Sequence, residues 1–183
     1  MKRTVAIGKQ NFASIIEENY FYIDKTSFLK EWWESGDDTT LIARPRRFGK
    51  TLNISMTEYF FSNKYAGRED LFEGLSIWQE EKYRQLQGTY PVISLSFARV
   101  KEENYENCRS KLCEILRNAY RGYSFLREGD FLEKGEREYF ERMMVEDGRG
   151  KDTDIALLSE GMEKERIRKY GFAFEGKKVL IGE

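Results

Sequence analysis

The sequence contains no histidine, and among its 183 residues there are only two cysteines and two prolines. Without histidine, serine–histidine and cysteine–histidine catalysis are excluded, as are histidine general bases and histidine metal ligands. Cys108 and Cys113 lie five residues apart on a helical pattern, which fits neither a C-x-x-C redox pair nor a zinc site. We therefore expect two reduced thiols, buried or half-buried, as suits a reducing cytoplasm.

Long apolar runs are also missing from the sequence. No run approaches the roughly 20 apolar residues that a helix needs to span a bilayer. Residues 1–6 carry charge but lead into no apolar segment of the kind found in a signal peptide. These features predict a cytoplasmic protein without a membrane partner. Lysine and arginine (31) nearly balance aspartate and glutamate (32), so the whole chain has no net attraction for nucleic acid.

The most informative stretch is residues 41–51, Leu-Ile-Ala-Arg-Pro-Arg-Arg-Phe-Gly-Lys-Thr. A short apolar run ends at a basic turn, and a Gly-Lys-Thr triplet then opens a helical pattern. This is the arrangement of a phosphate-binding loop, in which free N–H groups at a helix N-terminus bind an anion. Lys50 would reach the β- and γ-phosphates, Thr51 would offer its hydroxyl to Mg²⁺, and Gly49 would let the backbone approach closely. We therefore predict binding of ATP, or another nucleoside triphosphate, together with Mg²⁺.

The same loop has other interpretations. Arg44 occupies the position at which the usual phosphate-loop motif has its first glycine, and a basic turn that binds nothing is one alternative. A second alternative is a nucleic-acid module, in which the arginine cluster binds backbone phosphates in a salt-dependent manner. The predicted nucleotide-binding residues are Arg44, Arg46, Arg47, Phe48, Gly49, Lys50 and Thr51, with Thr51 also predicted as the Mg²⁺ ligand.

Hydrophobic periodicity predicts the elements around this loop. The expected helices are a short one at 12–16, one after Asp24 that ends near Gly36, one at 49–61 and one at about 104–123. The expected strands are 20–23, 39–43 directly before the loop, and 91–97, where Ile93, Leu95 and Phe97 alternate with serines. Beyond Gly122 the charged stretches predict solvated helix faces. A charged helix at 163–170 and a β-hairpin formed by 171–174 and 177–182 are expected near the end of the sequence.

The segment Tyr22-Ile23-Asp24-Lys25-Thr26 allows two interpretations. It could form a lid beside the nucleotide, or a contact on the adenine side of it. It could also be a helix cap with ordinary packing, which cap statistics favour. The sequence alone does not place this segment relative to the loop.

Three of these segments together resemble the AAA-ATPase-like family of gut bacteria: residues 12 and 20–26, residues 44–51, and residues 91–97. An arginine at the first-glycine position is usual in that family, so Arg44 fits the resemblance. The resemblance covers roughly residues 1–158. It implies a P-loop fold, with a parallel sheet flanked by helices, and a nucleotide site at Gly49, Lys50 and Thr51.

Residues 166–182 resemble a different segment, the end of the nuclease-like domain that often follows this ATPase-like domain. The acidic and lysine residues of that nuclease have no match here, so the chain resembles a shortened member of the family. The resemblance also implies an acidic strand that holds Mg²⁺, and the nearest match, residues 179–183, has Gly182 in place of the aspartate. Binding is therefore favoured over hydrolysis, and a remnant without function remains an alternative.

We accordingly predict an α/β chain in two parts. Residues 1–158 form an incomplete P-loop NTPase-like three-layer domain, with a short parallel sheet flanked by helices. Residues 159–183 form a helix and β-hairpin remnant. If the last residues pair beside 39–43 or 91–97, they fill the gap left by the missing strand. If they do not, the open edge of the sheet favours self-association.

Overall fold

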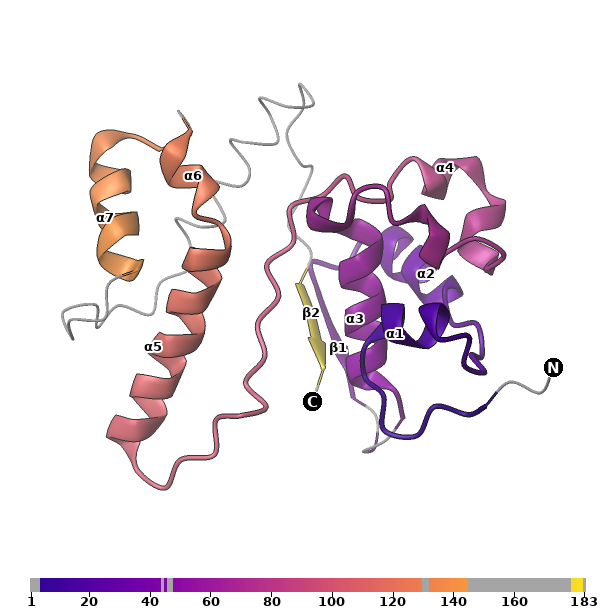
Figure 1. The fold of residues 1–183 in the computed structure, drawn as a ribbon, viewed down its shortest axis with the longest axis horizontal. Helices are drawn as coiled ribbons and strands as arrows, with labels where there is room; N and C mark the ends of the chain where they lie inside the picture. The colour runs from indigo at the N-terminus through magenta and orange to yellow at the C-terminus, as the bar shows by residue number, and fades with distance from the viewer. Residues whose placement is uncertain (1–3, 44, 46–47, 130–131, 145–178, 183) are drawn as a thin grey trace. The chain divides into compact units, whose positions relative to one another are not determined.

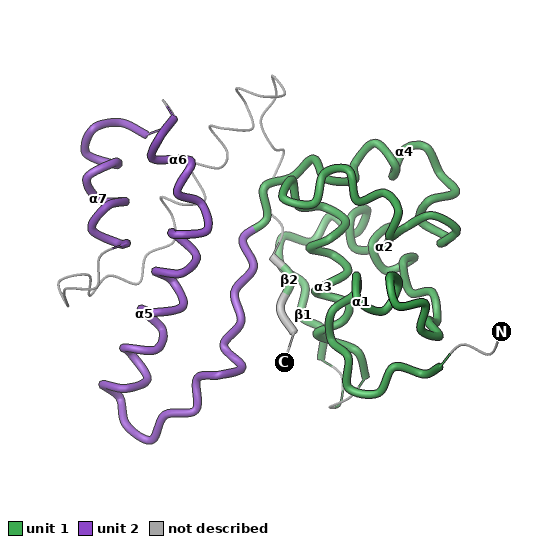
Figure 2. Tube along the Cα trace, viewed as in Figure 1, with its two compact units in different colours: residues 1–92, 174–183 green, residues 93–173 purple. Residues whose placement is uncertain are grey.

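The structure is a computed structural model that describes residues 4–43, 45, 48–129, 132–144 and 179–182. The chain divides into two compact units (Figure 2): unit 1 comprises residues 1–92 and 174–183, and unit 2 comprises residues 93–173. In chain order the elements of Figure 1 are α1 (Phe12–Glu17), α2 (Ser27–Glu34), β1 (Thr39–Ile42), α3 (Lys50–Phe61), the 3₁₀ turns η1 (Asn63–Tyr65), η2 (Glu69–Leu71) and η3 (Ser76–Gln79), then α4 (Glu81–Arg84), α5 (Tyr105–Gly122), α6 (Phe125–Glu128), α7 (Lys134–Met144) and β2 (Val179–Gly182).

The core of unit 1 is built from aromatic side chains that come from separate segments. The Phe12 ring of α1 stacks on Phe72 at a centroid distance of 5.2 Å, and the Phe60 ring of α3 meets Phe72 edge-on at 5.1 Å. All three side chains are fully buried. The Asn11 side chain caps α1 by accepting a hydrogen bond from the Ser14 N–H at 3.0 Å. The cap fixes the start of α1, and α1 packs against α3. The predicted helix at 12–16 is thus confirmed.

Strands β1 and β2 form a parallel pair (Figure 1), in a register that matches Thr39 with Val179 and Ile42 with Gly182. Unit 1 therefore includes a strand from near the end of the sequence. This is the alternative in which the last residues pair beside 39–43. The predicted hairpin assigned a different partner to residues 177–182, namely residues 171–174, which lie outside the described residues. Leu180 packs against the core of unit 1.

Two expectations about strands are wrong within the described residues. Residues 91–97 form no strand, although Ser94 and Ser96 are exposed as the alternation predicted. Phe97, expected on the buried face, is 51% exposed. Residues 20–23 contribute a single bridge, from Phe21 to Val5, where a short strand was predicted. In the described part of the chain the parallel sheet therefore has two strands, and the three-layer arrangement remains a prediction.

Residues 88–90 lie against the end of α3, and Gly88 makes a close contact there. The Gly88 N–H donates to the Phe60 carbonyl at 2.8 Å, and Asn63 N–H donates to the Tyr90 carbonyl at 2.7 Å. Gly88 has a φ of +67°, and a Cβ placed there would lie 2.5 Å from Ala66 Cα. Only glycine fits this position, because both the backbone conformation and the available space exclude a side chain.

Unit 2 has its own small core. The predicted helix at about 104–123 is confirmed as α5, which begins where the Asn104 side chain accepts a hydrogen bond from the Asn107 N–H at 2.8 Å. The Tyr120 ring of α5 packs edge-on against Phe140 of α7, with centroids 5.0 Å apart, and both side chains are fully buried. Cys108 and Cys113 are free and half-buried, as expected.

In the part of the chain that the structure describes, no helix combines the length and apolar character needed to cross a membrane. The predicted domain boundary at residues 158 and 159 falls outside the described residues and stays a prediction.

Candidate functional site

The loop predicted to bind phosphate runs from the end of β1 to the start of α3. Ile42, the last residue of β1, is buried, and Lys50 is the first residue of α3. The predicted helix at 49–61 is thus confirmed, and the segment has the strand–loop–helix order that a phosphate loop requires. Of the predicted site residues, Arg44, Arg46 and Arg47 lie outside the described residues.

Gly49 makes the turn into α3. Its φ of +77° and ψ of +20° place it in the left-handed region, which glycine adopts without the steric cost that a side chain would impose. Its carbonyl accepts the first hydrogen bond of the helix, from the Asn53 N–H at 2.9 Å. Because glycine has no side chain to cap the helix, the first backbone N–H groups of α3 have no capping partner on this residue. Such N–H groups and the helix dipole favour an anion.

The three described side chains around this turn differ in exposure. Phe48 is 59% exposed, and its N–H donates to the Pro45 carbonyl at 3.4 Å. Lys50 is half-buried, whereas Thr51 is exposed in the first turn of α3. The lysine and the hydroxyl predicted to act on phosphate and Mg²⁺ are therefore both in the first turn of one helix.

The structure adds one residue that the site prediction omitted. A Cβ placed on Gly49 would lie 3.5 Å from the Nζ atom of Lys25, so the Lys25 amine lies against the turn that starts α3. Lys25 is far from Gly49 in the sequence. Its position within residues 22–26 was the one sequence signal that could have suggested it, and only the fold shows that the two are neighbours.

Hydrogen bonds on both sides of Lys25 hold its backbone. Asp24 accepts hydrogen bonds from the Thr26 N–H at 2.8 Å and from the Ser76 N–H at 2.7 Å. The Thr26 hydroxyl, fully buried, accepts a hydrogen bond from the Ile77 N–H at 3.1 Å. This network fixes residues 24–26 to the start of η3. Of the interpretation that cap statistics favoured, the packing is observed, whereas α2 begins after Thr26 without a side-chain cap hydrogen bond.

On the other side of Lys25, Tyr22 ties the same segment to α3. The Tyr22 hydroxyl accepts a hydrogen bond from the Lys25 N–H at 3.4 Å and donates to Met56 Sδ at 3.2 Å. Burial raises the pKa of Tyr22 to about 12, so the hydroxyl keeps its proton at neutral pH. The segment that carries Lys25 is therefore attached to α3, the helix that follows Gly49.

Burial by itself would raise the pKa of the Asp24 carboxyl, but the hydrogen bonds from Thr26 and Ser76 act in the opposite direction. Together they outweigh burial and lower its pKa below the usual value. Asp24 is consequently a carboxylate at neutral pH, and it holds the two segments together as an ionised acceptor.

The residues around the loop are chemically compatible with a phosphate and its metal. Two side-chain oxygens, Thr40 Oγ1 on β1 and Asn53 Oδ1 on α3, are buried without a hydrogen-bond partner among the described residues. The Thr40 hydroxyl can donate a hydrogen bond to a phosphate oxygen, whereas the Asn53 amide oxygen only accepts and so suits a donor or a cation. The exposed Thr51 hydroxyl is an oxygen ligand of the kind that Mg²⁺ prefers.

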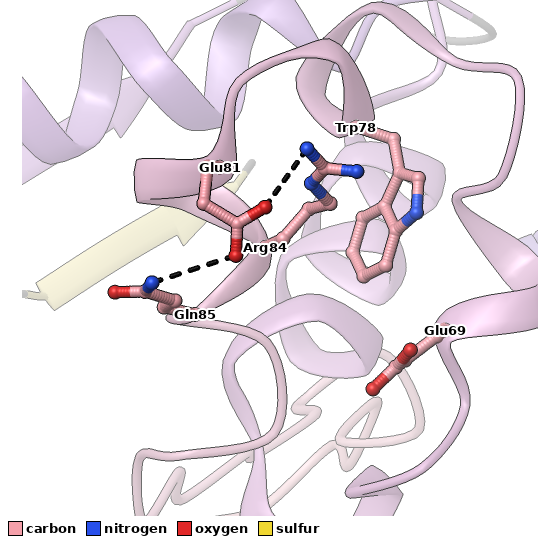
Figure 3. A pocket seen from close by; sticks show the side chains of 5 residues that line it. All are labelled: Glu69, Trp78, Glu81, Arg84 and Gln85. Atoms are coloured by element: carbon pink, nitrogen blue, oxygen red, sulfur yellow. Dashed lines mark hydrogen bonds and ion pairs between the residues drawn. The ribbon is translucent and has the colours of Figure 1, made fainter.

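A separate surface pocket of about 360 Å³ lies away from these residues (Figure 3). It is lined by Glu69, Trp78, Glu81, Arg84 and Gln85. Figure 3 shows the Arg84 and Gln85 side chains turned toward Glu81, which they contact at 2.8 Å and 3.4 Å. Three of the polar side chains of this pocket thus contact one another, and none of the predicted site residues lines it. Among the described residues no group of three metal-ligating side chains is present, here or elsewhere.

Comparison with known proteins supports the class that the loop and its flanking elements indicate. Residues 6–158 match the model of a family described as predicted AAA-ATPase, and the chain belongs to this family. A relative from Azotobacter chroococcum mcd 1, described as an uncharacterized protein in the vnfD 5' region, is 34% identical over 116 residues. That alignment covers 63% of this chain and 21% of the relative, so the chain spans about a fifth of that protein. No solved structure matches the chain.

Proposed function

We propose that the chain binds a nucleoside triphosphate, with ATP and Mg²⁺ as the first ligand to test, through residues 44–51. The observation that carries this proposal is the left-handed Gly49 at the start of α3, directly after the loop that follows β1, in a member of the predicted AAA-ATPase family. In this arrangement Lys50 pairs with the phosphates, and the first N–H groups of α3 donate to phosphate oxygens. Arg44, Arg46, Arg47 and Phe48 complete the proposed contact surface.

Mg²⁺, when bound with the nucleotide, neutralises phosphate charge, and Thr51 is the residue proposed to hold it. The fold that this function needs is a P-loop α/β domain with the β1–β2 pair in its sheet. The parallel register supports this proposal, because it places the carboxyl end of β2 beside the end of β1 that leads into the loop.

The proposal is for binding with slow turnover or none. P-loop NTPases hold Mg²⁺ with an aspartate on a neighbouring strand. In the register of the β1–β2 pair, Gly182 stands opposite Ile42 and brings no carboxylate to that position. The nucleic-acid alternative rests mainly on Arg44, Arg46 and Arg47, which lie outside the described residues, and no structural observation favours it.

The test is titration of Mg-ATP into the whole chain and into Lys50→Ala by calorimetry. We expect the substitution to weaken binding by about 10-fold to 100-fold, since it removes a charge-assisted hydrogen bond to phosphate. Thermal unfolding without ligand should be similar for both proteins, because Lys50 is only half-buried. Equal ATP affinity of the two proteins would refute the proposed site.

A further inference from the structure

Lys25 and Gly49 are separated in sequence but adjacent in the fold. The Lys25 Nζ atom lies 3.5 Å from the point where a Cβ of residue 49 would be. An ammonium group is thus held against the turn that precedes the first N–H groups of α3. Among the residues that the structure describes, this amine takes part in no ion pair.

The network around Lys25 fixes its backbone without using its amine. Tyr22 attaches the segment to α3 through Met56, and Asp24 attaches it to Ser76. The Lys25 side chain is half-buried, so it extends from a fixed backbone position toward Gly49 with less freedom than a surface lysine. Holding a charge in place in advance reduces the entropy that binding a ligand would otherwise cost.

We propose that Lys25 is a second phosphate-binding lysine, which acts with Lys50 on the phosphate chain of the nucleotide. This inference rests on the proposed function and extends it to a residue outside the loop. Two ammonium groups at one helix N-terminus attract a ligand more strongly as its negative charge increases. Lys25 therefore contributes to selecting nucleoside triphosphates over monophosphates, a role that a packing residue would not have.

The experiment measures the affinity of the whole chain for Mg-ATP and for AMP by calorimetry, for wild type, Lys25→Gln, Lys25→Arg and Lys50→Ala. Lys101→Gln serves as the control for loss of one positive charge, because Lys101 is exposed and belongs to unit 2. We expect Lys25→Gln to weaken ATP binding about 10-fold or more, and AMP binding by less than about 3-fold. Lys25→Arg should keep most of the ATP affinity, and Lys101→Gln should bind like wild type.

The outcomes separate this inference from the function on which it rests. If Lys50→Ala loses ATP binding while Lys25→Gln binds ATP like wild type, the role of Lys25 is refuted and the proposed site stands. If Lys25→Gln weakens ATP and AMP equally, Lys25 is a structural residue and the inference is again refuted. If Lys50→Ala binds ATP as well as wild type, both proposals fail together. Thermal unfolding of each variant identifies any loss that comes from misfolding.

Discussion

In unit 1, the Phe12 ring stacks on the distant Phe72, and a strand from residues 179–182 pairs with β1. In unit 2, the central contact joins Tyr120 of α5 to Phe140 of α7, two helices with the short α6 between them in the chain. The side chains are equally buried in both cases. Unit 1 thus depends on contacts between distant segments, whereas unit 2 depends on contacts between neighbouring ones.

The difference bears on function because the proposed site is in unit 1. Gly49, Lys25 and the segments that hold them meet only when distant parts of the chain have come together. A site assembled in this way depends on the integrity of the whole unit, so damage to its core should abolish binding as well as stability. Damage of equal size in unit 2 should leave ligand binding largely intact.

The largest expected effect tests this contrast directly, by comparing Phe60→Ala with Phe140→Ala. Each substitution removes a fully buried ring, and each should lower the free energy of unfolding by about 3–5 kcal/mol. Denaturant titration measures that change. We expect only Phe60→Ala to reduce the binding of Mg-ATP by folded protein, because Phe60 belongs to α3, whose first turn carries the proposed site. Equal loss of binding in the two variants would contradict the proposed independence of the site from unit 2.

A smaller effect is expected where unit 1 closes on itself at Gly88. Gly88→Ala places a side chain on a left-handed backbone and also against Ala66. Gly67→Ala has only the strain of the left-handed backbone, because a Cβ on Gly67 lies in open space. We expect Gly67→Ala to cost about 1 kcal/mol and Gly88→Ala at least about twice as much. Thermal unfolding of the two variants measures the difference. Similar costs would show that Ala66 moves aside readily.

The smallest predicted effect concerns Asp24 and pH. Its pKa in the folded protein is lowered, so its contribution to stability is present above the unfolded-state pKa of about 4. That contribution is lost as pH falls through the lower pKa of the folded protein. Because Asp24 is largely exposed, we expect Asp24→Asn to remove only about 1 kcal/mol at neutral pH, and less near pH 3. Urea titrations at both pH values test this, and a pH-independent cost would contradict it.

The sequence predicted α3 and α5 well, because each helix has a local signal. Helix α3 is preceded by a glycine and has apolar residues at helical spacing, and α5 is capped by an asparagine. The strand at 91–97 was predicted from local alternation, but a strand also needs a hydrogen-bonded partner. This segment lies where the chain passes from unit 1 to unit 2, with Val92 packed in one core and Ile93 in the other.

The candidate site was predicted only in part. Lys50 and Thr51 follow from the Gly-Lys-Thr triplet, whose spacing carries its own chemical meaning. The proximity of Lys25 to Gly49 depends on Asp24 and Thr26 binding the start of η3, a contact between distant segments with no local signature. In the same way, the sequence offered the pairing of β2 with β1 only as one alternative. Only the structure shows that β1 is the partner and that the two strands run parallel.

The β1–β2 pair also sets an order of events during synthesis. β1 leaves the ribosome early, and the strand that pairs with it is made roughly 140 residues later. At about 5–20 residues per second, synthesis of the intervening residues takes on the order of ten seconds. During that interval this edge of β1 has unpaired N–H and C=O groups that another chain could bind. Rapid formation of unit 2 would not shorten the interval, because translation sets it. A chaperone that covers β1 in this window would therefore increase the yield of folded unit 1.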